Sequence, residues 1–266
     1  MLKLLFLFIS LIFLFAKEGV QTYGELDHDE LSVYIINNNP FDITYKYTAT
    51  YDSLYPMQEL PILNSIEGNK TQLLAKFMVI GGKYQLTNSY SWVLGNKNAV
   101  HDNTYFYRLP YETGATFQVT QGFNGSFSHK GDSQYAIDFG MDVGTKVYAS
   151  REGIVVMTKN DGYRSGANRT FANEANHITI KHEDGTYGKY VHLKKGGVAV
   201  EVGQKVKRGD FIGYSGNTGW TNGPHLHFVV FTGKDHKSRK SIPIKFITSQ
   251  GIIIEPIRGQ RYTAIE

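Results

Sequence analysis

Two histidines, His225 and His227, stand two residues apart in an apolar run at the end of the stretch Gly213–Phe228. Side chains alternate between the faces of a β-strand, so both imidazoles should leave one face while Leu226 points into the core. The glycine, asparagine and proline residues before this pair indicate a series of tight turns. Two imidazoles on a strand that follows such a loop suit metal binding. Such a pair also occurs as hydrogen-bonded polar residues on half-exposed strands, so donors elsewhere in the chain decide between the two interpretations.

Three more polar residues lie in or beside other predicted strands and could complete a set of metal ligands: His129, Asp138 and His192. Zinc accepts imidazole nitrogen and carboxylate oxygen, and a catalytic zinc takes three protein ligands and leaves the fourth position to water. Two imidazoles then remain beside the metal, where one can take a proton and another can stabilise an oxyanion. Because the chain has no cysteine, thiolate zinc sites and disulfide bonds are excluded.

These residues fall in five motifs that follow one another across nearly half the chain. The motifs are SH at 128–129, YAIDFGMDVGTKVYAS at 135–150, NHITIKHEDGTYGKYVHL at 176–193, VGQKVKRGDFIGYSGNTG at 202–219 and GPHLHF at 223–228. In this order they resemble the zinc metallopeptidases of the lysostaphin and LytM type, peptidase family M23. The resemblance implies His129, Asp138 and His227 as zinc ligands. It implies His192 and His225 as the catalytic pair, and leaves open which acts as base and which stabilises the transition state.

One spacing departs from the family pattern. The shorter family motif places the aspartate four residues after the histidine, whereas Asp138 follows His129 by nine residues. Asp132, three residues after His129, is therefore a competing ligand. Asp138 is preferred because, like the family's aspartate, it directly precedes an apolar residue and the G-T-x-V turn. The longer spacing implies an inserted loop, residues 130–134, at the mouth of the site.

The resemblance also implies a function. A member of this family would be a secreted Zn²⁺-dependent endopeptidase that hydrolyses peptide bonds in peptidoglycan cross-links, with the peptide stems or cross-links as its partner. A non-catalytic LytM-like protein that binds the wall or activates an amidase is the alternative, but such proteins typically lack one or more ligands. A biotinyl-lipoyl carrier domain is suggested only by residues 202–216, and it leaves the histidines unexplained.

Composition predicts the fold that must hold these residues. Tyrosine, phenylalanine and glycine are abundant, and short apolar runs alternate with turn residues, so we expect an all-β protein. The length of 266 residues allows two modest domains. About seven short strands between residues 28 and 107 predict a small N-terminal β-sandwich-like domain. An M23-type antiparallel β-sheet domain with an open groove is expected to follow.

The predicted boundaries are set by changes in pattern along the chain. Residues 17–110 are expected to form the N-terminal β-rich domain, with 17–30 as an unstructured lead and 108–112 as the linker. Residues 111–257 are expected to form the peptidase domain, and 258–266 its tail. In that domain, Tyr190 and His192 should share one face of a strand. His182, beside a hairpin turn, should be exposed.

Residues 1–16 have the pattern of a signal peptide. Lys3 precedes an apolar run from Leu4 to Ala16, which is short for a membrane span, and Ala16 offers a small residue for cleavage. Leu14 fits the cleavage pattern poorly, so an uncleaved, transient membrane anchor stays open. We expect secretion across the inner membrane and a periplasmic or cell-envelope location. The net charge of +4, spread along the chain, does not indicate nucleic-acid binding, and the sequence does not indicate the oligomeric state.

Overall fold

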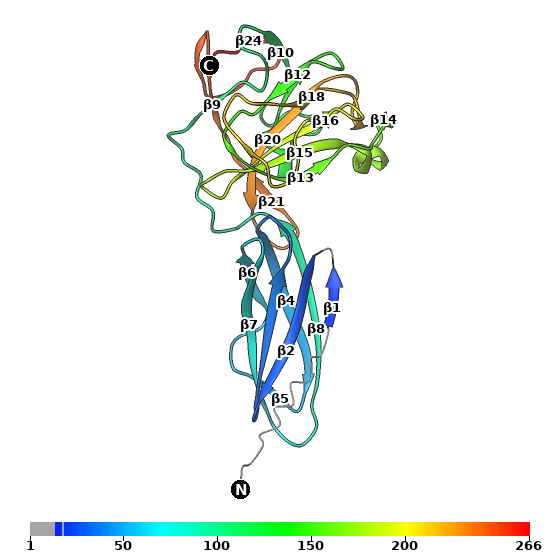
Figure 1. Cartoon of the computed structure of the whole chain (residues 1–266), viewed down its shortest axis with the longest axis vertical. Coiled ribbons are helices and arrows are strands. Elements are labelled where there is room, and N and C mark those ends of the chain that lie inside the picture. Colours follow the sequence, from blue (N-terminus) through cyan, green and yellow to red (C-terminus); the bar gives the residue numbers. More distant parts are fainter. Residues whose placement is uncertain (1–13, 18) are drawn as a thin grey trace. The chain divides into compact units, whose positions relative to one another are not determined.

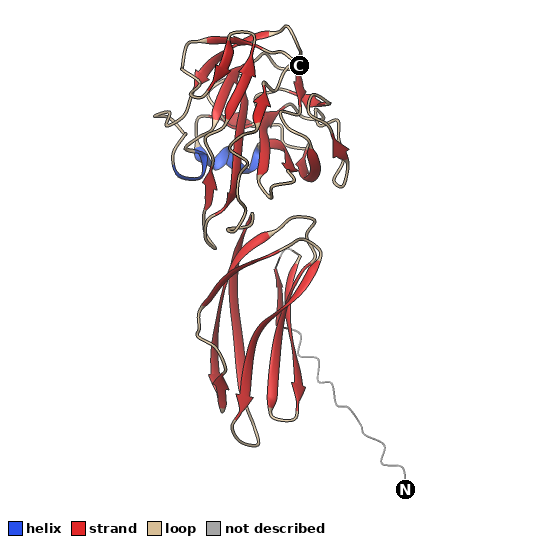
Figure 2. Cartoon of the chain, turned by 90° about the vertical axis from the view of Figure 1, so that its left-hand side faces the viewer, coloured by secondary structure: helices blue, strands red, loops and turns tan. Residues whose placement is uncertain are grey.

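The computed structural model describes residues 14–17 and 19–266. Nearly all its regular structure is β-strand, and the short helical segments lie in the C-terminal part, which confirms the predicted all-β class (Figure 2). The chain divides into two compact units. The first ends at Lys97 and includes 234–237, and the second comprises Asn98–Gly233 and Ser238–Glu266. Within the described residues, no helix has the length and apolar character needed to cross a bilayer. The predicted signal peptide falls largely outside these residues.

The first unit contains two antiparallel sheets (Figure 1). One has the strand order β1 (Leu14–Lys17), β2 (Val20–Asp27), β3 (Glu30–Asn37), β7 (Lys70–Val79), β5 (Leu54–Pro56). The other has the order β6 (Ile62–Ile66), β4 (Ile43–Asp52), β8 (Gln85–Leu94). The sheets face each other, since the ring of Tyr51 in β4 lies 5.6 Å from that of Phe77 in β7. Alternate burial along β3 matches a strand with one face in this core.

The lead expected at residues 17–30 is not unstructured. Residues Val20–Asp27 form β2, which pairs along its whole length with β3. Val20 and Thr22 are buried, and the ring of Tyr23 stacks on Tyr34 at 5.0 Å on the opposite face. The polar composition concealed this strand because few of its residues are strongly apolar. Backbone pairing and a cross-strand aromatic pair stabilise it instead.

The second unit is built on a nine-stranded antiparallel sheet (Figure 1). Its order is β17 (Lys205–Val206), β13 (Gly153–Lys159), β15 (Asn176–Lys181), β16 (Tyr187–Leu193), β20 (Leu226–Gly233), β11 (Ile137–Gly140), β10 (Thr116–Gln121), β24 (Arg261–Thr263), with β21 (Arg239–Ser241) also paired to β20. Smaller sheets join β12 (Lys146–Tyr148) with β18 (Phe211–Tyr214), β14 (Ser165–Gly166) with β19 (Gly219–Trp220), and β9 (Phe106–Arg108) with β22 (Lys245–Thr248) and β23 (Gly251–Ile253). Two 3₁₀ helices are η1 (Gly131–Ser133) and η2 (Arg169–Glu174).

The segment expected as a linker belongs to the core of the second unit. Leu109 and Tyr111 are fully buried, and the ring of Tyr111 lies 5.5 Å from that of Phe139. Strand β9, just before them, pairs with β22 from near the C-terminus. The division therefore falls at Asn98 rather than at Tyr111, because these apolar side chains belong to the hydrophobic core of the second unit.

The segment expected as a tail is also part of the sheet. Strand β24 pairs with β10, and Tyr262 is buried in the main hydrophobic core. The hydroxyl of Tyr111 donates a hydrogen bond to the Tyr262 carbonyl at 2.7 Å. The chain end thus extends the sheet beside the strand that leads to His129.

Candidate active site

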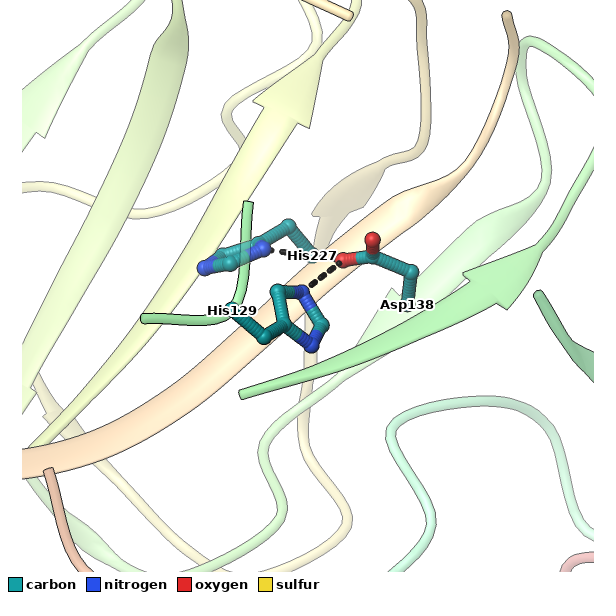
Figure 3. Close-up of side chains that lie close together, drawn as sticks. All are labelled: His129, Asp138 and His227. Carbon is teal, nitrogen blue, oxygen red and sulfur yellow. Dashed lines mark hydrogen bonds and ion pairs between the residues drawn. The ribbon is translucent and has the colours of Figure 1, made fainter. Parts of the chain in front are cut away.

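His129, Asp138 and His227 converge on one point of the second unit (Figure 3). One ligand atom from each lies within 4.8 Å of the others. His129 Nε2 is 3.1 Å, and His227 Nδ1 2.8 Å, from the same carboxylate oxygen, Asp138 Oδ1. His129 is fully buried and Asp138 is only 6% exposed. The structure thus brings together the three residues expected as metal ligands.

Sheet register positions two members of this group. Asp138 in β11 pairs directly with His227 in the neighbouring strand β20. Side chains of directly opposed residues lie on the same face, so the carboxylate and the imidazole must meet. Leu226, before His227, is buried in the core, as the alternation predicted. His129 comes from the loop after β10, where its backbone N–H donates to the Gly125 carbonyl at 3.1 Å.

The protonation of His129 follows from its hydrogen bonds. Its Nδ1 lies 2.7 Å from the carbonyl oxygen of Gly122, which can only accept, so Nδ1 carries the proton. In the neutral ring Nε2 then has a lone pair, and it faces the acceptor oxygen of Asp138. Nε2 has no hydrogen-bond partner among the described residues. The contact requires a cation, either a proton that charges a fully buried imidazole or a metal ion.

The charge on Asp138 supports the same conclusion. Burial alone would raise the pKa of this carboxyl, but its contacts with His129 and His227 outweigh burial and hold the pKa well below its usual range. Its other oxygen, Oδ2, accepts a hydrogen bond from Gln121 Nε2 at 2.8 Å. The site therefore offers one carboxylate and two imidazole nitrogens, a donor set that zinc accepts. These residues fit the metal that the sequence predicts.

His192 lies beside this group with its backbone in the left-handed region, at φ 67°. A non-glycine residue there is uncommon and is found where surrounding contacts hold it. Its Nδ1 donates to the Thr218 carbonyl at 2.7 Å, which leaves the lone pair on Nε2. Burial, followed by the neighbouring His225 and His227, lowers the pKa of His192 to about 3. The ring is neutral at pH 7.

The predicted shared face of Tyr190 and His192 was wrong. The Tyr190 ring packs in the core, 4.7 Å from that of Phe228, whereas the His192 ring lies 5.9 Å from that of His227. Phe228 and His227 are adjacent on β20 and point to opposite faces. The left-handed residue at the end of β16 breaks the alternation and turns His192 toward the site.

His225 completes the cluster. Its ring lies 4.6 Å from that of His192, and its Nε2 is 3.8 Å from Asp138 Oδ1. Its Nδ1 donates to the Gly223 carbonyl at 2.8 Å and lies 3.3 Å from the Thr221 hydroxyl. As in His192, Nδ1 is engaged by a carbonyl, so Nε2 is the nitrogen that faces Asp138.

The competing ligand Asp132 lies elsewhere. It sits in η1, and its Oδ2 is 3.2 Å from Arg239 Nε while its Oδ1 accepts from the Arg239 backbone N–H at 3.1 Å. Its carboxylate is thus engaged by the strand β21. Among the described residues, the group that could hold a metal contains Asp138 and not Asp132.

A cleft runs past the cluster in two parts. The larger, of about 590 Å³, is lined by Asp138 and His225 and bounded by residues 122–127 and 255–258. The smaller, of about 190 Å³, is lined by His227. Both parts share Ser128, His192 and Trp220. They therefore meet at the histidine cluster, and an extended chain could pass through both.

His182, expected to be exposed, is only 2% exposed. Its Nδ1 lies 3.0 Å from the Thr186 hydroxyl, and its ring packs edge-on against that of Tyr107 at 5.9 Å. The turn position suggested exposure, but the segment that carries Tyr107 covers this turn. Burial lowers the pKa of His182 to about 3, and the residue lies outside both parts of the cleft.

Sequence reasoning missed the residues that orient the histidines and the carboxylate. Gln121 holds Asp138, and the carbonyls of Gly122, Thr218 and Gly223 fix the rings of His129, His192 and His225. Every residue type has a backbone carbonyl, so residue identity does not predict these three hydrogen bonds. Gln121 had one detectable feature, a polar side chain at the end of a predicted strand, but its register with Asp138 depends on a long-range pairing.

Comparisons with known proteins agree with this geometry. Residues 132–239 match the family model described as Peptidase family M23. The chain is 41% identical over 105 residues to the peptidoglycan DD-endopeptidase ShyA of Vibrio cholerae, a match that covers 39% of this chain and 22% of that protein. It is 36% identical over 122 residues to the glycyl-glycine endopeptidase ALE-1 of Staphylococcus capitis (46% and 31%) and 35% identical over 122 residues to lysostaphin of Staphylococcus simulans (46% and 22%).

These matches span less than a third of the length of each of the three relatives. The matched family region contains Asp138, His192, His225 and His227, and it begins three residues after His129. Both the motifs and the site that they form lie in the second unit. The second unit of the chain therefore contains nearly all of a region, residues 132–239, that matches the model of peptidase family M23.

Proposed function

We propose that this protein is a secreted zinc endopeptidase that hydrolyses peptide bonds in the cross-links of peptidoglycan. One observation carries the proposal: a buried carboxylate oxygen faces two imidazole nitrogens, and one of these, His129 Nε2, points a lone pair at it in the neutral ring. The Nε2 atoms of two further imidazoles, His192 and His225, stand beside that point. The substrate is proposed from the relatives, since ShyA is named a peptidoglycan DD-endopeptidase and ALE-1 a glycyl-glycine endopeptidase.

In the proposed site, His129 Nε2, Asp138 and His227 Nδ1 would hold a zinc ion. Zinc bound by such a set polarises a carbonyl and lowers the pKa of water to near 7. The Gly122 carbonyl and Gln121 orient two of the ligands, since outer hydrogen bonds fix the tautomer of a histidine and the direction of a carboxylate. The buried position of His129 and Asp138 keeps competing water away from them.

His192 and His225 handle the proton. In each ring Nδ1 is held by a backbone carbonyl, which leaves Nε2 as the nitrogen for proton exchange, and both side chains line the cleft. A neutral imidazole accepts a proton as a general base, and the resulting imidazolium donates it to the leaving amine. The second ring, 4.6 Å away, stabilises the developing oxyanion when its own Nε2 carries a proton, so the two rings act in different protonation states. The carbonyl bonds keep both rings aimed without any movement of the backbone.

The cleft suits an extended peptide. Its two parts pass on either side of the shared residues Ser128, His192 and Trp220. The rings of Phe127 and Trp220, 5.6 Å apart, flank the larger part and give it an apolar edge. The non-catalytic alternative is not favoured, because every residue of the proposed ligand set is present and assembled.

Secretion forms part of the proposal and depends on the N-terminal sequence alone. The apolar run from Leu4 to Ala16 after Lys3 supports export, and a peptidoglycan substrate requires a location outside the inner membrane. Mass spectrometry of the mature protein should show an N-terminus at Lys17. An intact Met1 in the envelope fraction would indicate the uncleaved anchor instead.

The activity is tested on purified peptidoglycan sacculi. The full chain should release soluble muropeptides whose peptide cross-links are cut, and His227→Ala should release none. Exposed Lys205→Met, on the edge strand β17 remote from the cleft, is the matched control and should digest normally. If His227→Ala digests sacculi as well as the wild type, the proposed mechanism is wrong.

A further inference from the structure

Lys189 lies in the smaller part of the cleft. It is half-buried on β16, opposite Val229 of β20 and two pairs along the strands from the pairing of Val191 with His227. Lys189, Val191, Val229 and His227 all line this part. Among the described residues, Lys189 makes no hydrogen bond or ion pair with another side chain.

The acid nearest in the same part of the cleft is already engaged. Asp132 is the one aspartate or glutamate among the described residues that line this part, and it is held by Arg239 through side chain and backbone. Arg239 also stacks over Phe231, 5.0 Å from the ring centroid. Two cations thus share a single carboxylate, and the ammonium of Lys189 is the one left over.

The surroundings of Lys189 make an unpaired ammonium unfavourable in free energy. The ammonium of Lys189 is poorly solvated. Its burial, with Arg239 as the second cause, lowers the pKa of Lys189 to about 8. Cations that are partly removed from water are normally paired, and a free one here raises the affinity of the cleft for an anion. Because the two parts of the cleft meet at the histidine cluster, that anion would lie close to the bond that is cut.

We propose that Lys189 binds a carboxylate of the substrate peptide next to the scissile bond, so that the enzyme selects acid-bearing stem peptides over bridges made only of glycine. This inference rests on the proposed function and specifies its substrate. It bears on a difference among the relatives, one of which is named a DD-endopeptidase and another a glycyl-glycine endopeptidase. Lys189 acts here in specificity and takes no part in bond breaking.

The test uses the full chain and two pairs of synthetic cross-linked peptides. The members of a pair differ only in a free carboxylate or a carboxamide, placed in one pair on the residue that supplies the scissile carbonyl and in the other on the residue that supplies the amine. The wild type should prefer the acid over the amide in one pair by roughly tenfold to a hundredfold in kcat/KM, mainly through KM. The pair that shows the preference gives the direction of the peptide in the cleft.

Substitutions assign the preference to the ammonium. Lys189→Met should remove the preference and cut both members at the rate of the wild type on the amide, while Lys189→Arg should keep most of it. Lys205→Met should keep all of it. Equal cutting of acid and amide in both pairs by the wild type, or an unchanged preference in Lys189→Met, would overturn the inference.

A binding measurement separates this inference from the proposed function. His192→Ala, titrated calorimetrically with the same peptides, should bind the acid more tightly than the amide, and the double variant with Lys189→Met should not. If the wild type cuts no peptide but this preference appears, the proposed function fails and the carboxylate site stands. If peptides are cut without any preference, the carboxylate site fails alone.

Discussion

Two groups of buried histidine and aspartate side chains lie in the second unit, one at the turn after β15 and one at the cleft. At the turn, Asp184 accepts from Thr186 through one oxygen and from Arg151 and the Asp102 backbone through the other. At the cleft, one oxygen of Asp138 has a donor in Gln121, but the other faces two imidazole nitrogens.

The difference lies in the supply of protons and not in burial. Hydrogen bonds to Asp184 and the contacts of Asp138 hold the pKa of both carboxyls below their usual range, against the effect of burial. Burial lowers the pKa of both His182 and His192 to about 3. A shifted pKa therefore does not distinguish a structural group from a functional one. A buried acceptor that faces another acceptor does distinguish the two kinds of group, because such a contact is favourable only when a cation lies between the acceptors.

The largest effect should come from removing a member of the cleft group. Asp138→Ala should lower the rate of sacculus digestion by more than about a thousandfold and abolish zinc binding, since a catalytic zinc needs all three protein ligands. Asp184→Ala is the matched change at the turn, and the folded fraction of that variant should keep its zinc. Digestion rate and metal content are measured together. Equal loss of zinc in the two variants would remove the distinction between the groups.

The second-largest effect should come from removing either of the two imidazoles beside the proposed ligands. His192→Ala and His225→Ala should each reduce kcat by roughly a hundredfold to ten-thousandfold, the range of general acid–base catalysis, while zinc stays bound. Single-turnover cleavage of a cross-linked peptide measures the chemical step. Normal kcat in either variant would exclude that residue from proton transfer.

A smaller effect is expected at Gln121. Gln121→Ala removes the hydrogen bond to Asp138 Oδ2, and zinc affinity should fall by roughly tenfold to a hundredfold. Competition with a fluorescent chelator measures this affinity. Gln118→Ala, on the same strand and directed to the Gly259 carbonyl, serves as the control and should leave the affinity unchanged. An unaltered affinity in Gln121→Ala would show that Asp138 needs no such support.

At the turn, the effect should be on stability. Asp184→Ala leaves the buried guanidinium of Arg151 without its carboxylate, so the free energy of unfolding should fall by about 3 kcal/mol. Urea denaturation followed by the near-ultraviolet signal measures it. kcat of the folded enzyme should match that of the wild type. A change in kcat without a change in stability would place Asp184 in the catalytic machinery.

A further effect on stability appears only at acid pH. His182 is buried neutral, with a folded pKa of about 3 against about 6.5 in the unfolded chain. A lowered folded pKa contributes stability above pH 6.5, and that stability is lost as the pH falls from 6.5 toward 3. The loss approaches about 1.4 kcal/mol per pH unit. His182→Gln should therefore show a shallower decline in this interval by denaturant titration. Parallel declines would mean that His182 does not titrate with folding.

Local patterns predicted much of the cleft site. The two-residue period of a strand placed His225 and His227 on one side of Leu226, and the resemblance to the family motif favoured Asp138 over Asp132. The structure buries Leu226 in the core and groups Asp138 with His129 and His227. Burial of His182 and the divergence of His192 from Tyr190 were not predictable in this way. The first depends on Tyr107 from a distant segment, and the second on a single left-handed residue.

Long-range pairing explains the remaining differences. Gln121 reaches Asp138 because β10 pairs with β11 with a shift in register. The C-terminal residues join the sheet because β24 pairs with β10. Neither pairing follows from the residues of one strand, since β pairing is set by the whole sheet. Chemistry-bearing residues were thus easier to predict than the residues that hold them.

The most direct test is the zinc content of the full chain, purified without added metal or chelator and measured by mass spectrometry with inductively coupled plasma. The account predicts about one zinc per chain in the wild type and in His182→Gln, and a small fraction of that in His129→Ala, Asp138→Ala and His227→Ala. Zinc retained by these three variants, or a metal-free wild type that still digests sacculi, would contradict it.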